Sequence, residues 1–414
     1  MKLKSDSLGF TVLLAAMAGL PPLSTDIYLS ALSPMARSLG TAESAAGYTL
    51  SIFLAGFSLS QLVFGPMSDR LGRRPVGIFG CILFTFSALG CALSHSMAVL
   101  LFWRVWQGIG AGAVTVLAFA VVRDLFSGKE ARQRLAYVNA AMAFVPMVAP
   151  VLGSLLLRLT GWRSNFLLMA VLGLLLAVGF SFGLEESLLP ELRIMHSPAG
   201  LARNYLRILR TRSVFGYCLL TSFTFGSMLA YVTGSAVVFI DTMGMSGTHY
   251  GMMLFFTAGA IVIGSMLSGW LSQRDISFHV ILVTSLCLNI VAPCMLFLLG
   301  LTHWFTVATA LPLIMMTTLA VGLITPNAAH GALAPMGEIA GTAAAMLGSV
   351  RMLGGSVASA CVSFLKFAPP IAMTSVMLLF GVLAMVSYAF MAKNESVPSA
   401  VTGETVARAT ASKL

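Results

Sequence analysis

The stretch GPMSDRLGRRP, residues 65–75, separates two long apolar segments and carries four charges. A second stretch, GWLSQRD at 269–275, repeats its pattern Gly-x-x-Ser-x-Arg 204 residues later. An apolar segment that begins near Ser213 follows the first apolar segment, near residue 9, by the same offset. A shared offset for a motif and a helix start indicates a duplicated six-helix unit whose copies have the same orientation.

The composition predicts a membrane protein. Of 414 residues, 58% are hydrophobic and 9% are charged, and the mean hydropathy is +0.93; soluble domains average about 25% charged residues. A membrane-spanning helix needs roughly 20 apolar residues. Twelve such segments are present, at about 9–32, 47–67, 75–95, 97–122, 136–157, 163–184, 213–240, 249–271, 278–300, 305–327, 341–364 and 370–391.

Basic residues predict the orientation, because cytoplasmic loops are enriched in Lys and Arg. With the N-terminus inside, eighteen of the 24 basic residues fall on the cytoplasmic side and four on the outer side. We therefore expect both termini in the cytoplasm. This asymmetry accounts for most of the net charge of +10, so the lipid bilayer is an expected partner and nucleic acid is not.

The segments group into four regions. We expect a six-helix bundle at 1–184, a cytoplasmic linker at 185–212, a second six-helix bundle at 213–392 and a disordered cytoplasmic tail at 393–414. The linker run LARNYLRILRTR is basic and amphipathic, which is typical of a helix on the membrane surface.

Three charges fall inside the apolar segments: Asp26, Arg104 and Arg351. A charge at the bilayer centre costs about 2.5–3.5 kcal/mol on insertion scales, so such residues face a cavity or a partner. Asp26 and Arg104 both lie roughly 10 Å below the outer surface, counted at 1.5 Å per residue. We expect Asp26 and Arg104 to form an ion pair, which either takes part in function or only stabilises the structure.

Prolines predict bends near this pair. Pro21 and Pro22 stand one turn before Asp26, and each removes a backbone donor. An unwound turn beside a buried acid is typical of transporter sites, and a kink that serves packing alone is the alternative. In the fifth segment Pro146 and Pro150 are four residues apart, so that helix is expected to bend as well.

Other residues are candidates for the cavity and for gating. Gln107 shares a helix face with Arg104, and the aromatic side chains of Phe223 and Tyr231 are candidates to line an apolar cavity. Arg351 lies in a segment rich in Gly, Ala and Ser, and an acid, a substrate or backbone carbonyls are all open as its partner.

The loop GPMSDRLGRRP places Asp69 among Arg70, Arg73 and Arg74 at the cytoplasmic membrane edge. A carboxylate there is suited to cap the positive N-terminus of a neighbouring helix, and the segment that begins near Gly341 opens on the same side. Such a contact can form in one conformation and break in another. The simpler reading is that the positive charges only fix the topology.

These motifs resemble the major facilitator superfamily, its drug:proton antiporter group, and within that group the bicyclomycin and chloramphenicol resistance (Bcr/CflA) branch. The resemblance rests on GPMSDRLGRRP, on RVWQGIGAGA in the fourth segment, on APVLGS in the fifth, and on STDIYLSALSP, VVRDLF and GTAAAMLGSVR. Ser154 replaces the last glycine of the fifth-segment motif, and Ser30 replaces a proline of the first-segment motif.

The resemblance implies an all-α membrane protein with twelve transmembrane helices, in two six-helix bundles related by pseudo-twofold symmetry around a central cavity. It implies alternating access in the bacterial inner membrane, with proton coupling at Asp26 and Arg104 nearby. Ala18 stands where some relatives carry a second acid, so we expect coupling to one proton. Burial favours the neutral form of Asp26 and Arg104 favours its charged form.

We therefore expect proton-coupled efflux of small amphipathic drugs by a monomer, with protons and substrate as its partners. The alternative is proton-coupled transport of an endogenous metabolite such as a nucleoside, a sugar or an amino acid. An enzyme is not expected, because no HExxH, GxSxG or nucleotide-binding glycine-lysine loop is present. No cofactor or metal is expected, since the six cysteines show no metal-ligand spacing.

Overall fold

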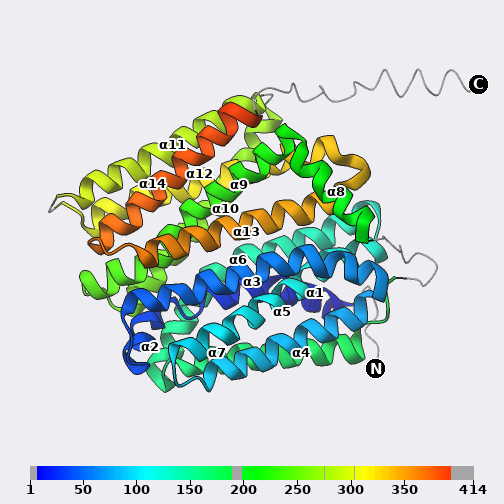
Figure 1. Ribbon diagram of the computed structural model, residues 1–414, viewed down its shortest axis with the longest axis horizontal. Coiled ribbons are helices and arrows are strands. Elements are labelled where there is room, and N and C mark those ends of the chain that lie inside the picture. The colour runs from blue at the N-terminus through cyan, green and yellow to red at the C-terminus, as the bar shows by residue number, and fades with distance from the viewer. Residues whose placement is uncertain (1–6, 189–197, 275, 303, 393–414) are drawn as a thin grey trace, which may run out of the picture.

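The computed structural model describes residues 7–188, 198–274, 276–302 and 304–392. Within these residues twelve helices are long and apolar enough to cross a membrane, which confirms the predicted number. The helices run side by side, with the first half of the chain in blue through cyan to blue-green and the second half in green to red (Figure 1). We call the end of the bundle where α1 begins the terminal face and the other end the opposite face.

The first half holds the elements α1 (Leu8–Asp26), η1 (Leu29–Ala31), α2 (Leu32–Ser38), α3 (Glu43–Leu71), α4 (Arg73–Ala92), α5 (Met97–Leu125), α6 (Gly128–Thr160), α7 (Arg163–Val178) and η2 (Gly179–Gly183). Helix α6 begins earlier than the predicted residue 136, because its first turns are polar and extend beyond the apolar segment that hydropathy detects. It continues through Pro146 and Pro150.

The second half holds α9 (Arg212–Ala236), η4 (Val237–Thr242), α10 (Gly247–Gln273), α11 (Phe278–Gly300), α12 (Val307–Leu333), η5 (Ala334–Ile339), α13 (Ala340–Phe364), α14 (Pro369–Ser387) and η6 (Tyr388–Ala392). Helix α9 begins 204 residues after α1, and α10 begins 204 residues after α3. The structure therefore confirms the repeat and the fold of two six-helix bundles that the sequence predicts. The predicted tail, 393–414, lies outside the described residues.

The first membrane span is broken beside its acid. The sequence predicts one helix over 9–32, but α1 ends at Asp26 and a 3₁₀ turn, η1, follows. Pro21 and Pro22 lie within α1 and supply no backbone donors. The Ser24 hydroxyl donates to the carbonyl of Leu20 at 2.7 Å, so a side chain satisfies part of the backbone near the prolines. This agrees with the predicted unwound turn beside Asp26.

Glycines let the central helices approach one another closely. A Cβ added at Gly108 of α5 would stand 2.1 Å from the carbonyl oxygen of Phe53 in α3, and one at Gly56 would stand 2.4 Å from that of Val105. Small residues allow such backbone contact between membrane helices. The crossing of α3 and α5 therefore depends on both glycines.

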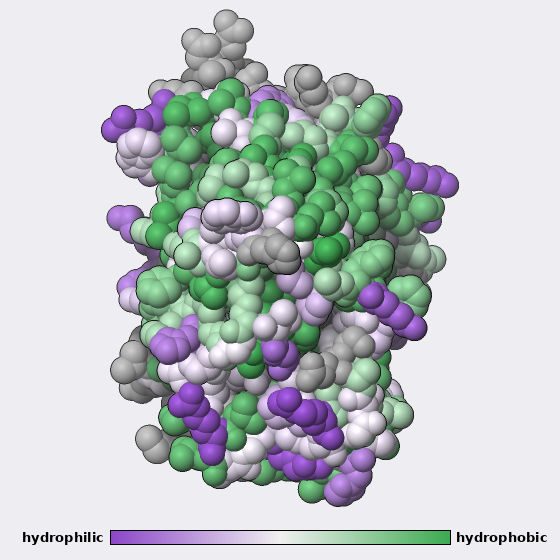
Figure 2. All heavy atoms as spheres, turned by 90° about the vertical axis from the view of Figure 1, so that its left-hand side faces the viewer, coloured by the Kyte–Doolittle hydropathy of each residue, from purple (hydrophilic) through white to green (hydrophobic). Residues whose placement is uncertain are grey.

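The two halves meet along α3 and α13 through serine side chains. The Ser58 hydroxyl donates to the carbonyl of Ser349 at 2.8 Å, and the Ser356 hydroxyl donates to the carbonyl of Ser51 at 2.7 Å. Near the opposite face, the Ser33 hydroxyl donates to the Asp241 carboxylate. Figure 2 views that face, where hydrophilic residues gather over the first half and hydrophobic residues cover much of the second.

The linker region contains α8 (Pro198–Arg210), which crosses the terminal face beside both halves (Figure 1). Ile208 is fully buried, whereas Leu206 and Leu209 are exposed. The Tyr205 hydroxyl donates to the carbonyl of Leu62 in α3 at 3.0 Å. Burial raises the pKa of Tyr205 to about 12, so the phenol keeps its proton at neutral pH and remains a donor. Residues 189–197 of the predicted linker lie outside the described residues.

We predict that Gly108→Ala lowers the stability of the folded protein by about 1–3 kcal/mol, because the added methyl group meets backbone that cannot rotate away. Gly269→Ala is the matched control, since no atom of the described residues lies within 4 Å of a Cβ at that position. Thermal unfolding of both variants in the same detergent measures the difference. Equal melting temperatures for the two variants would contradict the proposed role of Gly108.

Candidate functional site

Arg104 lies at the centre of the first half and is completely buried. Its Nε donates to the carbonyl of Thr49 in α3 at 3.1 Å. Nη1 and Nη2 both donate to the carbonyl of Ser24 in α1 at 3.3 Å. Nη1 also donates to Gln107 Oε1 at 2.7 Å and Nη2 to the Tyr28 hydroxyl at 2.9 Å. The guanidinium therefore ties α1, α3 and α5 together through oxygen acceptors.

Aromatic rings complete the surroundings of Arg104. Its guanidinium carbon stands 4.4 Å from the ring centre of Phe53 and 4.6 Å from that of Tyr28, within the range of cation–π attraction. Gln107 is also fully buried and donates to the Met169 sulfur at 3.3 Å. The sequence places Arg104 and Gln107 in a substrate cavity. In this conformation both are packed between helices instead, because neighbouring groups occupy their polar atoms.

Asp26 is the last residue of α1, and its side chain is partly exposed. The carboxylate accepts a hydrogen bond from the Thr25 hydroxyl at 2.9 Å. Its charge acts electrostatically on Tyr231 of α9 and Tyr250 of α10. Both tyrosines belong to the second half of the chain, so Asp26 is directed toward the boundary between the halves.

The predicted ion pair between Asp26 and Arg104 is wrong for this conformation. Within the described residues Asp26 makes no ion pair, and every hydrogen bond of Arg104 goes to another group. Successive residues of a helix are rotated by about 100°, so Asp26 points about 200° away from Ser24. Arg104 binds on the Ser24 side of α1. Residue counting predicted a similar depth for the two charges. It did not predict that Asp26 points to one side of α1 while Arg104 approaches α1 from another.

The two predicted aromatic lining residues have different surroundings. Tyr231 lies near Asp26, and its hydroxyl forms a hydrogen bond with the Thr257 hydroxyl at 3.2 Å. Phe223 packs instead against Phe380 of α14, with ring centres 5.8 Å apart. The structure therefore brings Tyr231 to the acid and turns Phe223 toward its neighbouring helix.

Helix α6 packs directly on the break after Asp26. A Cβ added at Gly153 would stand 1.5 Å from the carbonyl oxygen of Ile27. Pro150 is buried and Pro146 is partly buried one turn earlier. On the same helix, Val151 contacts Gly251 of α10. The APVLGS motif thus joins the end of α1 to the second half.

A charged network covers the terminal face between α3 and α4. Arg73 binds Asp69 at 2.5 Å and Asp124 at 2.8 Å. The Glu186 carboxylate accepts the backbone N–H groups of Arg73 at 2.8 Å and of Arg74 at 3.2 Å. It therefore caps the positive N-terminus of α4.

This network differs from the expected one in its partners. Asp69 was expected to cap the helix that begins near Gly341, yet in this conformation it binds Arg73. Arg70 is exposed. Sequence reasoning missed Asp124 and Glu186. Asp124 stands in VVRDLF, one of the motifs that carry the family resemblance, whereas nothing in the sequence around Glu186 indicates that it reaches the start of α4.

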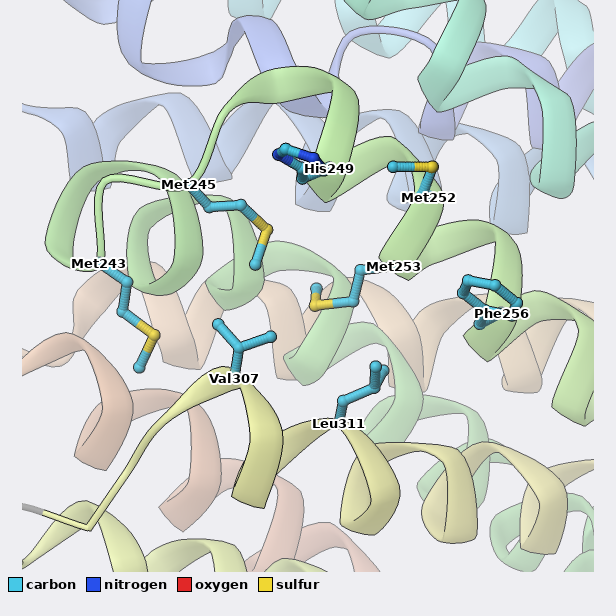
Figure 3. A pocket seen from close by; sticks show the side chains of 8 residues that line it. All are labelled: Met243, Met245, His249, Met252, Met253, Phe256, Val307 and Leu311. Carbon is cyan, nitrogen blue, oxygen red and sulfur yellow. The ribbon is translucent and has the colours of Figure 1, made fainter.

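One cavity, of about 460 Å³, lies near the opposite face between α10 and α12. Figure 3 shows Met245 and Met253 pointing toward Val307 and Leu311, with His249 at one edge. Its lining is otherwise apolar. The candidate site is at Asp26 rather than here, because a charge inside a membrane span usually faces a cavity or a partner and no carboxylate is among the described residues that line this cavity.

We predict that Arg104→Gln destabilises the folded state by at least about 2 kcal/mol, because several buried acceptors lose a charged donor. Arg158→Gln is the control, since Arg158 is exposed. Fluorescence-detected size-exclusion chromatography after heating measures the loss of folded protein. A variant at position 104 as heat-resistant as the control would show that the buried network does not hold α1, α3 and α5 together.

Comparison with known proteins places the chain in a family. The family model for the Major Facilitator Superfamily matches residues 14–359. The MFS-type transporter YdgK of Bacillus subtilis is 31% identical over 86% of this chain and 88% of its own length. A bicyclomycin resistance protein homologue of Haemophilus influenzae is 27% identical over 92% and 96% of the two chains. Multidrug resistance protein D of Escherichia coli is 26% identical over 91% and 94%.

Solved structures show the same fold. A bacterial homologue of the human lysosomal transporter Spinster, in an inward-facing and unoccupied conformation, superposes with a TM-score of 0.73 at 15% identity, covering 94% of this chain and 98% of that one. A D-xylose–proton symporter superposes with a TM-score of 0.71 at 16% identity, covering 93% and 98%. The duplicated bundles, the matching family model and these relatives agree, and the chain belongs to the major facilitator superfamily of membrane transporters.

Proposed function

We propose that the protein exports amphipathic drugs across the bacterial inner membrane in exchange for protons, by alternating access. The observation that carries the proposal is Asp26: a partly exposed carboxylate inside a membrane span, directed at the other half and without an ion pair in the described part of the chain. Two relatives named for bicyclomycin and multidrug resistance support drugs as the substrate class.

The absence of a cation beside Asp26 within the described residues changes the mechanism expected from the sequence. A charged carboxylate at this depth is costly unless something neutralises it. A proton neutralises it by binding. A substrate hydroxyl, amide N–H or ammonium group stabilises the charged form by hydrogen bonding, and so favours release of the proton. Proton and substrate then compete at one carboxylate.

The contacts between the halves support a state closed at the opposite face. There Ser33 binds Asp241, and Val151 contacts Gly251. With the terminal face in the cytoplasm, as the basic residues predict, this state corresponds to one that receives substrate from inside. Exchange with the opposite state would require α13 to move along α3, and the serine and glycine contacts between these helices suit a sliding interface.

The charged network is proposed to gate that movement. In this conformation Arg73 and its acids join α3, α4 and α5 within the first half. Asp69 remains partly exposed, with 28% of its side chain accessible. When the terminal face closes, Asp69 becomes available to the N-terminal end of α13, as the sequence predicts. Arg70 and Arg74 then act as positive charges at the membrane edge.

We predict that Asp26→Asn abolishes drug accumulation driven by a pH gradient and preserves drug exchange without one, because asparagine keeps the size of the side chain and binds no proton. One pH unit supplies about 1.4 kcal/mol per proton, enough for roughly tenfold accumulation by the wild type. Purified protein in vesicles, given a phenicol with and without an imposed gradient, measures both activities.

Glu130→Gln is the matched control, because Glu130 is an exposed carboxylate at the start of α6. Gradient-driven accumulation by the Asp26→Asn variant at the wild-type level would remove Asp26 from the coupling step. If only nucleosides, sugars or amino acids respond to the gradient, the protein is a metabolite carrier and the drug substrate is wrong.

A further inference from the structure

Arg351 is a second arginine inside the membrane, and its surroundings differ from those of Arg104. It lies in the span Gly341–Phe364 of the second half. Its guanidinium carbon stands 4.4 Å from the ring centre of Phe225 in α9. Its Nε is buried and has no hydrogen-bond partner in the part of the chain that the structure describes. Across the described residues no ion pair reaches it, and the side chain is partly exposed.

The exposed part of Arg351 faces the interior of the protein. The outward side of α13 is marked by Leu353, Val357 and Phe364, which are 49%, 48% and 74% exposed. At about 100° per residue, these three lie roughly 200–240° around the helix from Arg351. Gly355, one turn after Arg351, contacts Phe225. The guanidinium therefore points toward α9 and away from the lipid-facing side.

Comparison with Arg104 distinguishes an arginine whose nitrogens all donate to protein oxygens from one that has open hydrogen-bond donors among the described residues. The protein supplies oxygen acceptors to all three nitrogens of Arg104. For Arg351 it supplies an aromatic ring and no acceptor among the described residues. Packing needs alone would favour an apolar side chain at this position, since an unneutralised charge inside a span is unfavourable. A guanidinium with open donors fits a carboxylate or a phosphate, which it binds through two parallel hydrogen bonds.

We propose that Arg351 recognises an anionic oxygen group, a carboxylate or a phosphate, on the transported molecule, with Phe225 as the platform beneath the guanidinium. This assignment rests on the proposed transport of amphipathic molecules and names the substrate class for that site. Asp26 on the first half and Arg351 on the second then present opposite charges to one substrate. Amphipathic zwitterions complement both charges, whereas aromatic acids complement Arg351 alone.

The test compares aromatic acids with their own methyl esters, which differ only in the negative charge and one methyl group. A panel of three scaffolds, including a fluoroquinolone, is bound to purified protein in nanodiscs made of zwitterionic lipid. We expect at least one acid to bind wild-type protein about tenfold more tightly than its ester, the effect of a charge-assisted hydrogen bond. Arg351→Gln should remove this preference, because the acid binds more weakly while the binding of the ester is unchanged. Arg351→Lys should keep part of the preference.

Arg158→Gln serves as the control, because Arg158 is exposed at the opposite face. Melting temperatures of all variants confirm that each is folded, and the retained binding of the ester confirms an intact site. An unchanged acid preference in the Arg351→Gln variant overturns the assignment, as does a wild type that prefers no acid in the panel. A further arm adds anionic phospholipid. If the anionic phospholipid displaces the acid from the protein, a lipid headgroup is the occupant of the Arg351 site. That result would also overturn the assignment.

The same vesicles distinguish this inference from the proposed function. Gradient-driven uptake of a neutral phenicol tests coupling at Asp26 and does not require an anion at Arg351. If uptake remains coupled while the acid preference is absent, only the role of Arg351 fails. If the acid preference is present and depends on Arg351, but phenicol uptake does not depend on the pH gradient, only the proposed proton coupling at Asp26 fails.

Discussion

The packing of the first half depends on the hydrogen bonds of the buried Arg104 guanidinium. No water is available in the hydrocarbon core to satisfy a guanidinium, so the protein must supply the acceptors. Carbonyl oxygens of Ser24 and Thr49, the Tyr28 hydroxyl and the Gln107 amide do so. Two of these acceptors are backbone atoms of α1 and α3, which fixes the positions of these helices relative to α5.

The same interaction sets the direction of Asp26. Because Arg104 binds the Ser24 side of α1, the carboxylate two residues later points to the other side, where Tyr231 and Tyr250 lie. The break after Asp26 is held in turn by Gly153 of α6, which allows contact with the carbonyl of Ile27. One short segment therefore positions the buried Arg104 guanidinium on one side of α1 and the Asp26 carboxylate, the proposed proton site, on the other.

The arginines inside the membrane spans of the two halves, Arg104 and Arg351, have different surroundings. Arg104 has an oxygen acceptor for each of its nitrogens and holds helices together, whereas Arg351 rests on Phe225 and finds no acceptor among the described residues. Transport by alternating access needs both kinds of contact, because a rigid unit must move against another without losing its own structure. Charges satisfied within one half preserve that half during the movement. In the proposed mechanism, the charges that have no partner of opposite sign among the described residues, Asp26 and Arg351, are the ones that bind the proton and the substrate.

The sequence by itself determined the twelve membrane spans, the 204-residue repeat and the break beside Asp26, because hydropathy, helix period and proline chemistry are local properties. It also placed Tyr231 among the residues near the site. Only the tertiary structure decided that Arg104 turns away from Asp26, that Phe223 packs on Phe380, and that Glu186 caps α4. Counting residues gives the depth of a side chain along its helix, whereas its direction and its partners depend on how the helices pack.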